Sequence, residues 1–269
     1  MHDPWVLANF KPRPLDVLIT TAPKAGTTWM QQILHQLRSG GDPDFESIDV
    51  VVPWLECPRG GKSWQDVLSD YEAIADPRVF KTHCTYLQTP GVDTARLILS
   101  SRDPRDCCVS FYHHILDMTD EARRRAGIKC PDSFDAYLES WLEFGAWYRN
   151  VQSWWSHRKD DNLLWLRYED MKVDLEGSTD QILQFLGWDL SVKARERALE
   201  YCSFGWMKAN ADRFTRQGGD KPMFKPGGFI RKGTVGDHKN LLTKEHEKKV
   251  LDKAHEMLER ECLEFLGIA

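Results

Sequence analysis

Four short runs of aliphatic and β-branched residues recur along the sequence, and a helix-like or loop segment follows each of them. The runs cover residues 15–21, 78–84, 95–101 and 162–168. Their centres are continuously apolar, without the alternation that a half-exposed strand shows, which is typical of strands buried on both faces. Such strands alternating with amphipathic helices predict an α/β fold, a parallel sheet flanked by helices on both faces.

The segments between these runs show the spacing of helices. Apolar residues recur every three or four positions over 28–37 and, with many aromatic side chains, over 134–155. A charged amphipathic helix is expected over 245–266. The sequence has no internal repeat, low-complexity tract or clear linker, so a single domain over residues 1–269 is the simplest organisation.

The balance of charge argues against some functions. With 36 Lys and Arg against 41 Asp and Glu, the formal net charge of the 269 residues is −5. Proteins that bind nucleic acid are usually basic, so no nucleic-acid partner is expected. Residues 208–239 nevertheless contain eight bases and three acids. This local excess predicts a focused anion site in a chain that is acidic elsewhere.

Cysteines and apolar runs indicate the compartment. The seven cysteines include no Cys-x-x-Cys pair, and no secretory signal precedes them, so reduced thiols and a cytoplasmic location are expected. The longest purely apolar runs are far below the roughly 20 residues that span a bilayer, so no membrane span is expected. Cys107 and Cys108 near His113 and His114 match no familiar ligand spacing, so no metal site is expected.

A phosphate-binding loop is predicted at residues 22–29, Ala-Pro-Lys-Ala-Gly-Thr-Thr-Trp, between the first strand and the next helix. The free N–H groups and the positive dipole at the start of a helix bind anions. Lys24 adds a full charge, and the hydroxyls of Thr27 and Thr28 add hydrogen-bond donors. A plain strand-to-helix turn would explain a capping threonine but not the lysine.

The spacing of this loop differs from that of nucleoside triphosphatases. In their motif a lysine directly follows the second glycine, and a serine or threonine holds Mg²⁺. Here Lys24 precedes Gly26 by two positions, and the last strand ends in Arg167-Tyr168-Glu169 without a clear metal-holding aspartate. The loop is therefore expected to bind phosphate without a metal.

Three further polar clusters follow strand ends or lie in loops. Residues 101–106 read Ser-Arg-Asp-Pro-Arg-Asp, with Ser110 a turn or two into the following helix; residues 81–83 read Lys-Thr-His; and residues 229–233 read Phe-Ile-Arg-Lys-Gly. In open α/β sheets the ligand lies outside the carboxyl ends of the strands. These clusters are therefore expected to converge.

Taken in order, these motifs resemble the cytosolic sulfotransferase family: PKAGTTW, KTH, SRDPRDCCVSFYHH, LRYEDM and FIRKGTVGDHKN. They run from about residue 20 to residue 243 in the family's order. The resemblance implies a phosphate-loop type of parallel sheet. It also implies transfer of a sulfuryl group from 3′-phosphoadenosine 5′-phosphosulfate (PAPS) to a hydroxyl or amine of an apolar small molecule, leaving 3′-phosphoadenosine 5′-phosphate (PAP), with no metal.

The resemblance implies where the two anionic ends of PAPS are held. The 5′-phosphosulfate falls to the 22–29 loop, and the 3′-phosphate to residues 101–110 and 229–233, while residues 208–239 form a lid. The residues implied to bind the nucleotide are Lys24, Ala25, Gly26, Thr27, Thr28, Trp29, Arg102, Ser110, Tyr168, Ser203, Phe204, Met207, Phe229, Arg231, Lys232 and Gly233.

The resemblance also implies catalytic roles. His83 is the expected general base, because an imidazole with a pKa of about 6.5 can accept a hydroxyl proton at neutral pH. Lys24 is expected to stabilise charge on the leaving nucleotide during an in-line displacement. Lys81 lies two residues before His83, on the same face of a strand, and is expected to reach the transferring group. Gly218-Gly219 and Gly227-Gly228 are the expected hinges of the lid.

The chain departs from the family pattern in three places. Cys84-Thr85 follow the histidine where the family usually has Leu-Pro, which changes the acceptor wall. Few residues precede the first strand, which predicts a more open acceptor site. The family's dimer motif has lysine in place of its valine and its acidic residue, so that dimer is not expected; the motif maps onto Lys239, Thr243, Lys244 and Lys248.

Two other readings stay open at this level, a phosphate-loop kinase or hydrolase and a non-catalytic nucleotide-binding protein. The loop spacing argues against the first. The presence of both Lys24 and His83 argues against the second, because a pure binder needs no base. The identity of the acceptor is not readable, although an apolar partner is suggested by Trp54, Trp64, Tyr86, Phe111 and Trp141.

Overall fold

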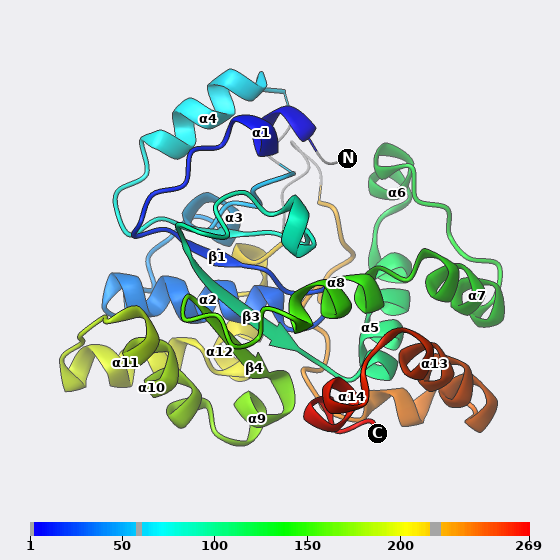
Figure 1. Ribbon diagram of the computed structural model, residues 1–269. Helices are drawn as coiled ribbons and strands as arrows, with labels where there is room; N and C mark the ends of the chain where they lie inside the picture. Colours follow the sequence, from blue (N-terminus) through cyan, green and yellow to red (C-terminus); the bar gives the residue numbers. More distant parts are fainter. Residues whose placement is uncertain (1–2, 58–60, 216–221) are drawn as a thin grey trace.

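The computed structural model describes residues 3–57, 61–215 and 222–269 (Figure 1). A four-stranded sheet has the order β2-β1-β3-β4, and every neighbouring pair is parallel. The strands are β1 (Val17–Ile19), β2 (Val79–Lys81), β3 (Arg96–Ser101) and β4 (Leu163–Arg167). Each lies within one of the four predicted apolar runs, and the predicted α/β fold with a parallel sheet is confirmed.

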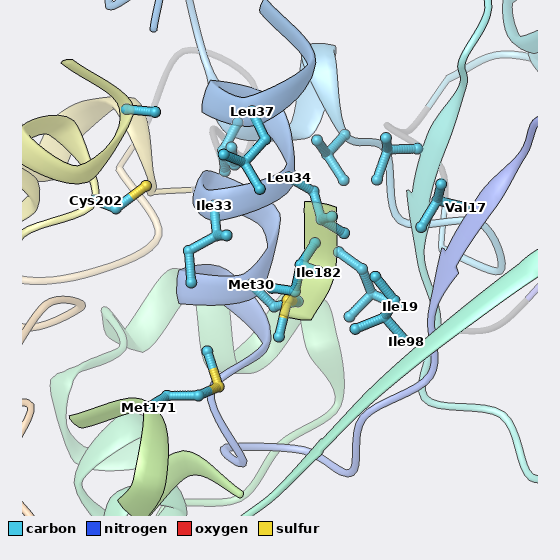
Figure 2. Packing of buried hydrophobic residues seen from close by; sticks show 14 of the residues in the cluster. Val17, Ile19, Met30, Ile33, Leu34, Leu37, Ile98, Met171, Ile182 and Cys202 are labelled. Atoms are coloured by element: carbon cyan, nitrogen blue, oxygen red, sulfur yellow. The ribbon is translucent and has the colours of Figure 1, made fainter. Parts of the chain in front are cut away.

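Successive residues of β1 point to opposite faces of the sheet, and helices cover both faces. On one face Val17 and Ile19 pack in one cluster with α2 (Thr27–Ser39), whose Met30 and Leu34 lie on the side toward Ile19 in Figure 2. On the other face Leu18 packs in a separate cluster that includes Trp154. The helices of the first face include α10 (Leu175–Leu186) and α11 (Val192–Tyr201); those of the second include α1 (Pro4–Asn9) and α4 (Trp64–Glu72).

Helix α5 (Pro104–Asp117) continues from the end of β3 and carries several residues of the site. Its N-cap Asp103 accepts a hydrogen bond from the backbone N–H of Arg105 at 2.8 Å, and Pro104 occupies the first turn, where its missing N–H costs nothing. The remaining helices are α3 (Ile48–Val51), α6 (Asp120–Ala126), α9 (Tyr168–Val173), α12 (Phe204–Ala209) and the short turns η1 (Tyr86–Gln88), η2 (Ala211–Arg213) and η3 (Asp237–Asn240).

The prediction of one continuous helix over 134–155 is wrong. The segment forms α7 (Phe134–Phe144) and α8 (Ala146–Trp155), with Gly145 between them at a φ of 56°. This left-handed conformation ends a helix and favours glycine, so the break could have been read from Gly145. The break also leaves Phe144 69% exposed, while Trp147 and Trp154 of α8 are buried.

The prediction of one helix over 245–266 is wrong in the same way. The chain forms α13 (Lys244–Met257) and α14 (Arg260–Leu266), and Leu258 between them is extended. The turn lets Leu258 and residues of α14 pack on the cluster around Trp155. Burial of a new apolar stripe therefore outweighs continuation of the helix.

Apart from the end of α12, the described part of the predicted lid contains no long helix or strand. It is held to α5 and the loop that follows it, since the backbone N–H of Lys225 donates to Asp117 O at 2.8 Å and that of Thr119 to Met223 O at 2.9 Å. The predicted hinge Gly218-Gly219 lies outside the described residues. None of the helices that the structure describes is long and apolar enough to cross a bilayer.

Candidate active site

A cavity of about 1020 Å³ opens at the carboxyl ends of the parallel strands. All the residues predicted from sequence to bind the nucleotide or to act in catalysis line it, except Ala25 and Ser203. Ala25 is buried behind the loop, where its carbonyl accepts a hydrogen bond from Ser100 Oγ at 2.8 Å. Ser203 caps α12, its Oγ accepting from the N–H of Trp206 at 3.2 Å. The fold thus brings the predicted segments together, and their individual roles stay predictions.

Backbone conformation shapes the 22–29 loop. Lys24 has a φ of 67° and Gly26 a φ of 97°, in the left-handed region that few residues other than glycine adopt. A Cβ added to Gly26 would lie 2.9 Å from Cδ2 of Tyr168, so only glycine fits. Gly26 is also the N-cap of α2 and offers no side chain to the first helical N–H groups. The loop therefore presents these N–H groups to an anion.

The two threonines of the loop differ in their surroundings. Thr27 is buried, and its hydroxyl lies 2.7 Å from the hydroxyl of Thr21, which follows β1. Thr28 is half-buried and lines the cavity. Thr27 thus also ties the start of α2 to the end of β1.

Lys24 lines the cavity from the loop before α2. Its Nζ is 3.2 Å from Nδ1 of His114 and 5.5 Å from the ring centre of Phe229. The cavity leaves Lys24 partly exposed, but its ammonium is enclosed. Burial together with the charges of Arg102 and Lys81 lowers the pKa of Lys24 to about 8. A site that destabilises its own ammonium in this way favours an anionic ligand.

Arg102 forms the wall opposite the loop, directly after β3. Its Nη2 donates to Thr234 O at 2.8 Å, and its guanidinium lies over the ring of Tyr168 at 4.6 Å. The side chain is 9% exposed and also pairs with Asp106 at 3.2 Å. Ser110, two turns along α5, lines the same part of the cavity.

A second cationic group comes from the segment after the lid. Arg231 Nη2 and Lys232 Nζ lie 2.5 Å and 2.8 Å from the carboxylate of Asp237. Burial raises the pKa of Asp237, but the hydrogen bonds from Lys232 and Arg231 outweigh it and keep that pKa below its usual value. Gly233 has a φ of 59°, and a Cβ there would lie 2.6 Å from the ring of Phe204. The cations are therefore preassembled beside the cavity.

Asp106 anchors this segment to α5. The buried carboxylate accepts hydrogen bonds from the N–H of Gly236 at 2.8 Å, from the N–H of His238 at 2.9 Å and from His238 Nδ1 at 2.8 Å. Burial alone would raise the pKa of Asp106. The hydrogen bonds from His238 and the charge of Arg102 outweigh burial and lower this pKa to about 2. One carboxylate thus joins Arg102 to the segment that carries Arg231.

His83 lies two residues after β2 and lines the cavity. Its Nδ1 is 2.7 Å from the carbonyl oxygen of Thr21, and its backbone N–H donates to Glu56 Oε1 at 2.8 Å. A carbonyl oxygen only accepts, so Nδ1 carries the hydrogen and Nε2 carries the lone pair of the neutral ring. The ring of Trp54 meets His83 edge-on at 5.1 Å. The imidazole is thus held in the tautomer that a base at Nε2 requires.

Lys81 is the last residue of β2 and also lines the cavity. Its Nζ is 3.7 Å from a carboxylate oxygen of Asp49 and 4.6 Å from the ring centre of Trp54. Asp49 was not found from the sequence, since it lies in a short helix without any motif. Its role is to balance the charge of Lys81 beside His83.

The rest of the cavity wall is largely apolar. Its apolar side chains come from α5, from the residues just after α6, from the end of α7 and from the segment 222–233: Phe111, Ile128, Phe144, Met223, Phe224 and Phe229. Of the five aromatic residues expected near an acceptor, Trp54 and Phe111 line the cavity. Trp64, Tyr86 and Trp141 pack in hydrophobic clusters instead, and that part of the expectation is wrong.

The cysteines near the cavity are not poised for chemistry. Burial raises the pKa of Cys84, which lines the cavity, to about 11 and that of Cys108 to about 12. Burial also holds the pKa of Cys107 well above its usual value. A metal ligand or nucleophile must be a thiolate, and these thiols stay protonated at neutral pH. Within the described residues, no three His, Cys, Asp or Glu side chains gather as metal ligands.

A parallel sheet whose strand ends carry a lysine loop and separate arginine residues defines an α/β protein of the phosphate-loop type. The family described as "Sulfotransferase domain" matches residues 14–260. Sulfotransferase 1E1 of Bos taurus is 32% identical over 249 residues, which cover 87% of this chain and 80% of that relative. The chain therefore belongs to the sulfotransferase family, as its motifs indicated.

Solved structures share the fold. Mouse sulfotransferase SULT7A1 complexed with PAP superposes with a TM-score of 0.74 at 24% identity, covering 98% of this chain and 93% of that one. Retinol dehydratase in complex with androsterone and inactive cofactor PAP superposes with a TM-score of 0.72 at 23% identity, covering 94% of this chain and 83% of that one. At these identities the likeness concerns the fold.

Proposed function

We propose that this protein transfers a sulfuryl group from PAPS to a hydroxyl group of an apolar small molecule. The observation that carries the proposal is the charge of the cavity. Lys24, Lys81, Arg102, Arg231 and Lys232 line it, against the carboxylates Asp49 and Asp237. Burial and, to a smaller extent, the neighbouring cations lower the pKa of Lys24, and an anionic ligand would offset the repulsion among these cations.

The cavity residues fit PAPS. The loop with its N–H groups and Lys24 suits the phosphosulfate, and Arg102, Ser110, Arg231 and Lys232 suit a separate phosphate. The adenosine between them would contact Trp29, Tyr168, Phe204, Met207 and Phe229, which are apolar or aromatic. Two relatives in fold were solved with PAP, which supports the same ligand here. When bound, PAPS supplies the sulfuryl group and a nucleotide that can leave.

His83 is the proposed general base. The bond from Nδ1 to the carbonyl of Thr21 fixes the ring and leaves the lone pair on Nε2. Nε2 can take the proton of an acceptor hydroxyl as its oxygen bonds to sulfur. Lys24 stabilises negative charge on the departing nucleotide, and Lys81 adds charge beside His83. The apolar wall around Phe111 and Phe224 favours an apolar acceptor.

We also propose that the protein acts in the cytoplasm, on the strength of its family. Cys84-Thr85, where the family usually has Leu-Pro, keep a changed acceptor wall as a prediction.

The test uses the purified protein with ³⁵S-labelled PAPS and a panel of phenols, sterols and aliphatic alcohols. We expect label transfer to at least one hydroxyl, and loss of transfer by about 10²–10⁴-fold in His83→Ala. PAP, but not ATP with Mg²⁺, should raise the melting temperature of both proteins, because His83 lies away from the nucleotide. Equal transfer by His83→Ala would refute the base, and stabilisation by ATP alone would refute the nucleotide.

A further inference from the structure

His114 occupies a position in the cavity that the reaction outlined above does not use. It lies in the last turn of α5, four residues after Ser110, so both residues are on the same side of the helix. Its ring centre is 4.8 Å from that of Phe224 and 6.0 Å from that of Phe229, and it stacks on Phe111 at 5.8 Å. The imidazole is thus enclosed by aromatic rings on the acceptor side of the cavity.

In the part of the chain that the structure describes, the imidazole has one polar side-chain contact, with the lysine of the loop: His114 Nδ1 lies 3.2 Å from Lys24 Nζ. An ammonium only donates, so Nδ1 must be the acceptor and the ring hydrogen must sit on Nε2. Burial and the charges of Lys24 and Lys81 hold the pKa of His114 well below its usual value. The ring is therefore neutral at physiological pH and suited to accept.

Among the described residues, the other charged and titratable groups that act on Lys24 do not offer such an acceptor. Arg102, Lys81 and Arg231 are cations that repel the ammonium, and the thiol of Cys107 is protonated. His83, whose charge also acts on His114, binds the carbonyl of Thr21 with its Nδ1. The hydrogen bond that Lys24 Nζ donates to His114 Nδ1 favours the charged form of Lys24 against these neighbours.

We infer that His114 is a positioning residue for Lys24: its neutral imidazole holds the ammonium at the junction of the nucleotide and acceptor parts of the cavity and keeps it protonated. This inference rests on the proposed function, in which the charge of Lys24 assists departure of the nucleotide. It also gives the acceptor side of the cavity a direct link to the loop, because the same ring packs on Phe111 and Phe224.

The first test measures the titration of Lys24 itself, without substrate. Protein labelled with ¹³C at lysine Cε is followed by NMR between pH 6 and 11, and Lys24→Arg assigns the signal. In His114→Phe the ring size is kept and the acceptor is lost, so the pKa of Lys24 should fall by about one unit. In His114→Asn the amide oxygen can accept, and the pKa should return toward that of the wild type.

The matched control is His113→Phe, which replaces the neighbouring histidine of the same helix. The ring of His113 contacts Tyr112, and the titration of Lys24 should not change. If His114→Phe does not fold, His114→Leu gives the same test. An unchanged Lys24 titration in His114→Phe or His114→Leu overturns the inference.

The second test measures kcat/KM for PAPS against pH, which reports groups of the free enzyme. The alkaline limb should move to lower pH in His114→Phe, since Lys24 loses its proton earlier, and kcat/KM at pH 7.5 should fall on the order of tenfold. The limb should disappear in Lys24→Arg. A change in acceptor KM alone would make His114 a wall residue and overturn the inference. Absence of transfer by the wild type would refute the proposed function, whereas the NMR titration would still decide on His114.

Discussion

The two ends of the nucleotide cavity are built in different ways. The 22–29 loop is fixed by its backbone, with left-handed residues at Lys24 and Gly26 between β1 and α2, which both pack in the central core. The segment 229–240 has one short turn, η3, and is held by the carboxylates of Asp106 and Asp237. Backbone conformation and apolar packing hold the 22–29 loop in place. The 229–240 segment is held by interactions with carboxylates, which an anionic ligand can replace.

This difference suggests a division of labour. A rigid loop keeps Lys24 in one position, which a group that stabilises a transition state requires. Arg231 and Lys232 already have an anionic partner in Asp237, which a bound phosphate must partly displace. The loop end should therefore govern the rate of transfer, and the 229–240 end the affinity for the nucleotide.

Lys24→Met gives the largest expected effect. Removal of the ammonium should lower kcat/KM for PAPS by about 10²–10³-fold, with most of the loss in kcat, because the charge matters most as the nucleotide departs. Initial rates measure the loss in kcat, and titration calorimetry with PAP measures any loss in nucleotide affinity. Lys193→Met, on the exposed face of α11, is the matched control. A loss confined to PAP affinity, with kcat unchanged, would contradict the view that the loop end governs the rate of transfer.

Arg231→Met should act on affinity instead. The dissociation constant of PAP should rise about tenfold to a hundredfold, the value of a hydrogen bond to a charged group, while kcat changes little. Titration calorimetry with PAP and initial rates at saturating PAPS provide the measurements. An equal fall in kcat would show that both ends take part in the chemical step.

Asp106→Asn tests the anchor of the second end. The pKa of Asp106 is depressed from 3.8 to about 2 in the folded protein, so its stabilising contribution is present above pH 4 and is lost as the pH falls toward 2. That contribution amounts to about 2 kcal/mol. Urea unfolding should show a deficit for Asp106→Asn at pH 7 that shrinks at pH 3. A deficit independent of pH would point to packing alone.

Asp237→Asn should change stability and binding in opposite directions. Without its carboxylate, Arg231 and Lys232 repel each other, so the melting temperature of the ligand-free protein should fall by about 2–4 °C. The increase caused by saturating PAP should be larger than in the wild type, since no ion pair has to be given up. Thermal unfolding with and without PAP measures both. A smaller PAP effect would mean that Asp237 aids binding.

Thr243→Ala, remote from both ends, gives the smallest expected effect. Thr243 caps α13, its Oγ1 accepting from the N–H of His246 at 3.2 Å, so its loss should cost about 1 kcal/mol. Because lysines replace the valine and the acidic residue of the family's dimer motif, sedimentation should show no Thr243-dependent dimer. A dimer that Thr243→Ala dissociates would contradict this.

The parts of the fold that local sequence controls were predictable. The apolar runs gave all four strands because burial on both faces leaves a continuous apolar signal. The loop could be recognised from Lys24 and Gly26, since a lysine beside a glycine at a strand-to-helix turn has few structural explanations. The breaks at Gly145 and Leu258 were missed because helical periodicity continues across them. Gly145 carries a local signal, since its left-handed conformation favours glycine, whereas at Leu258 packing decides where the chain turns.

The contacts between distant segments were not predictable. His114 meets Lys24 across 90 positions of sequence, and Asp49 meets Lys81 from a helix without a motif. Ala25 and Ser203 match the family pattern but do not line the cavity, because one braces the loop and the other caps a helix. Motifs locate a site, and tertiary packing selects which of their side chains face it.

The wall of the cavity begins at Pro23 and ends at Asp237, so it joins parts of the chain made early and late in synthesis. A fragment that lacks either part lacks a complete binding site, and occupancy by a nucleotide therefore marks a chain that has finished folding. A ligand that binds only the native state opposes unfolding by mass action. The concentration of sulfuryl donor in a cell should thus affect the resistance of this protein to unfolding as well as its catalytic rate.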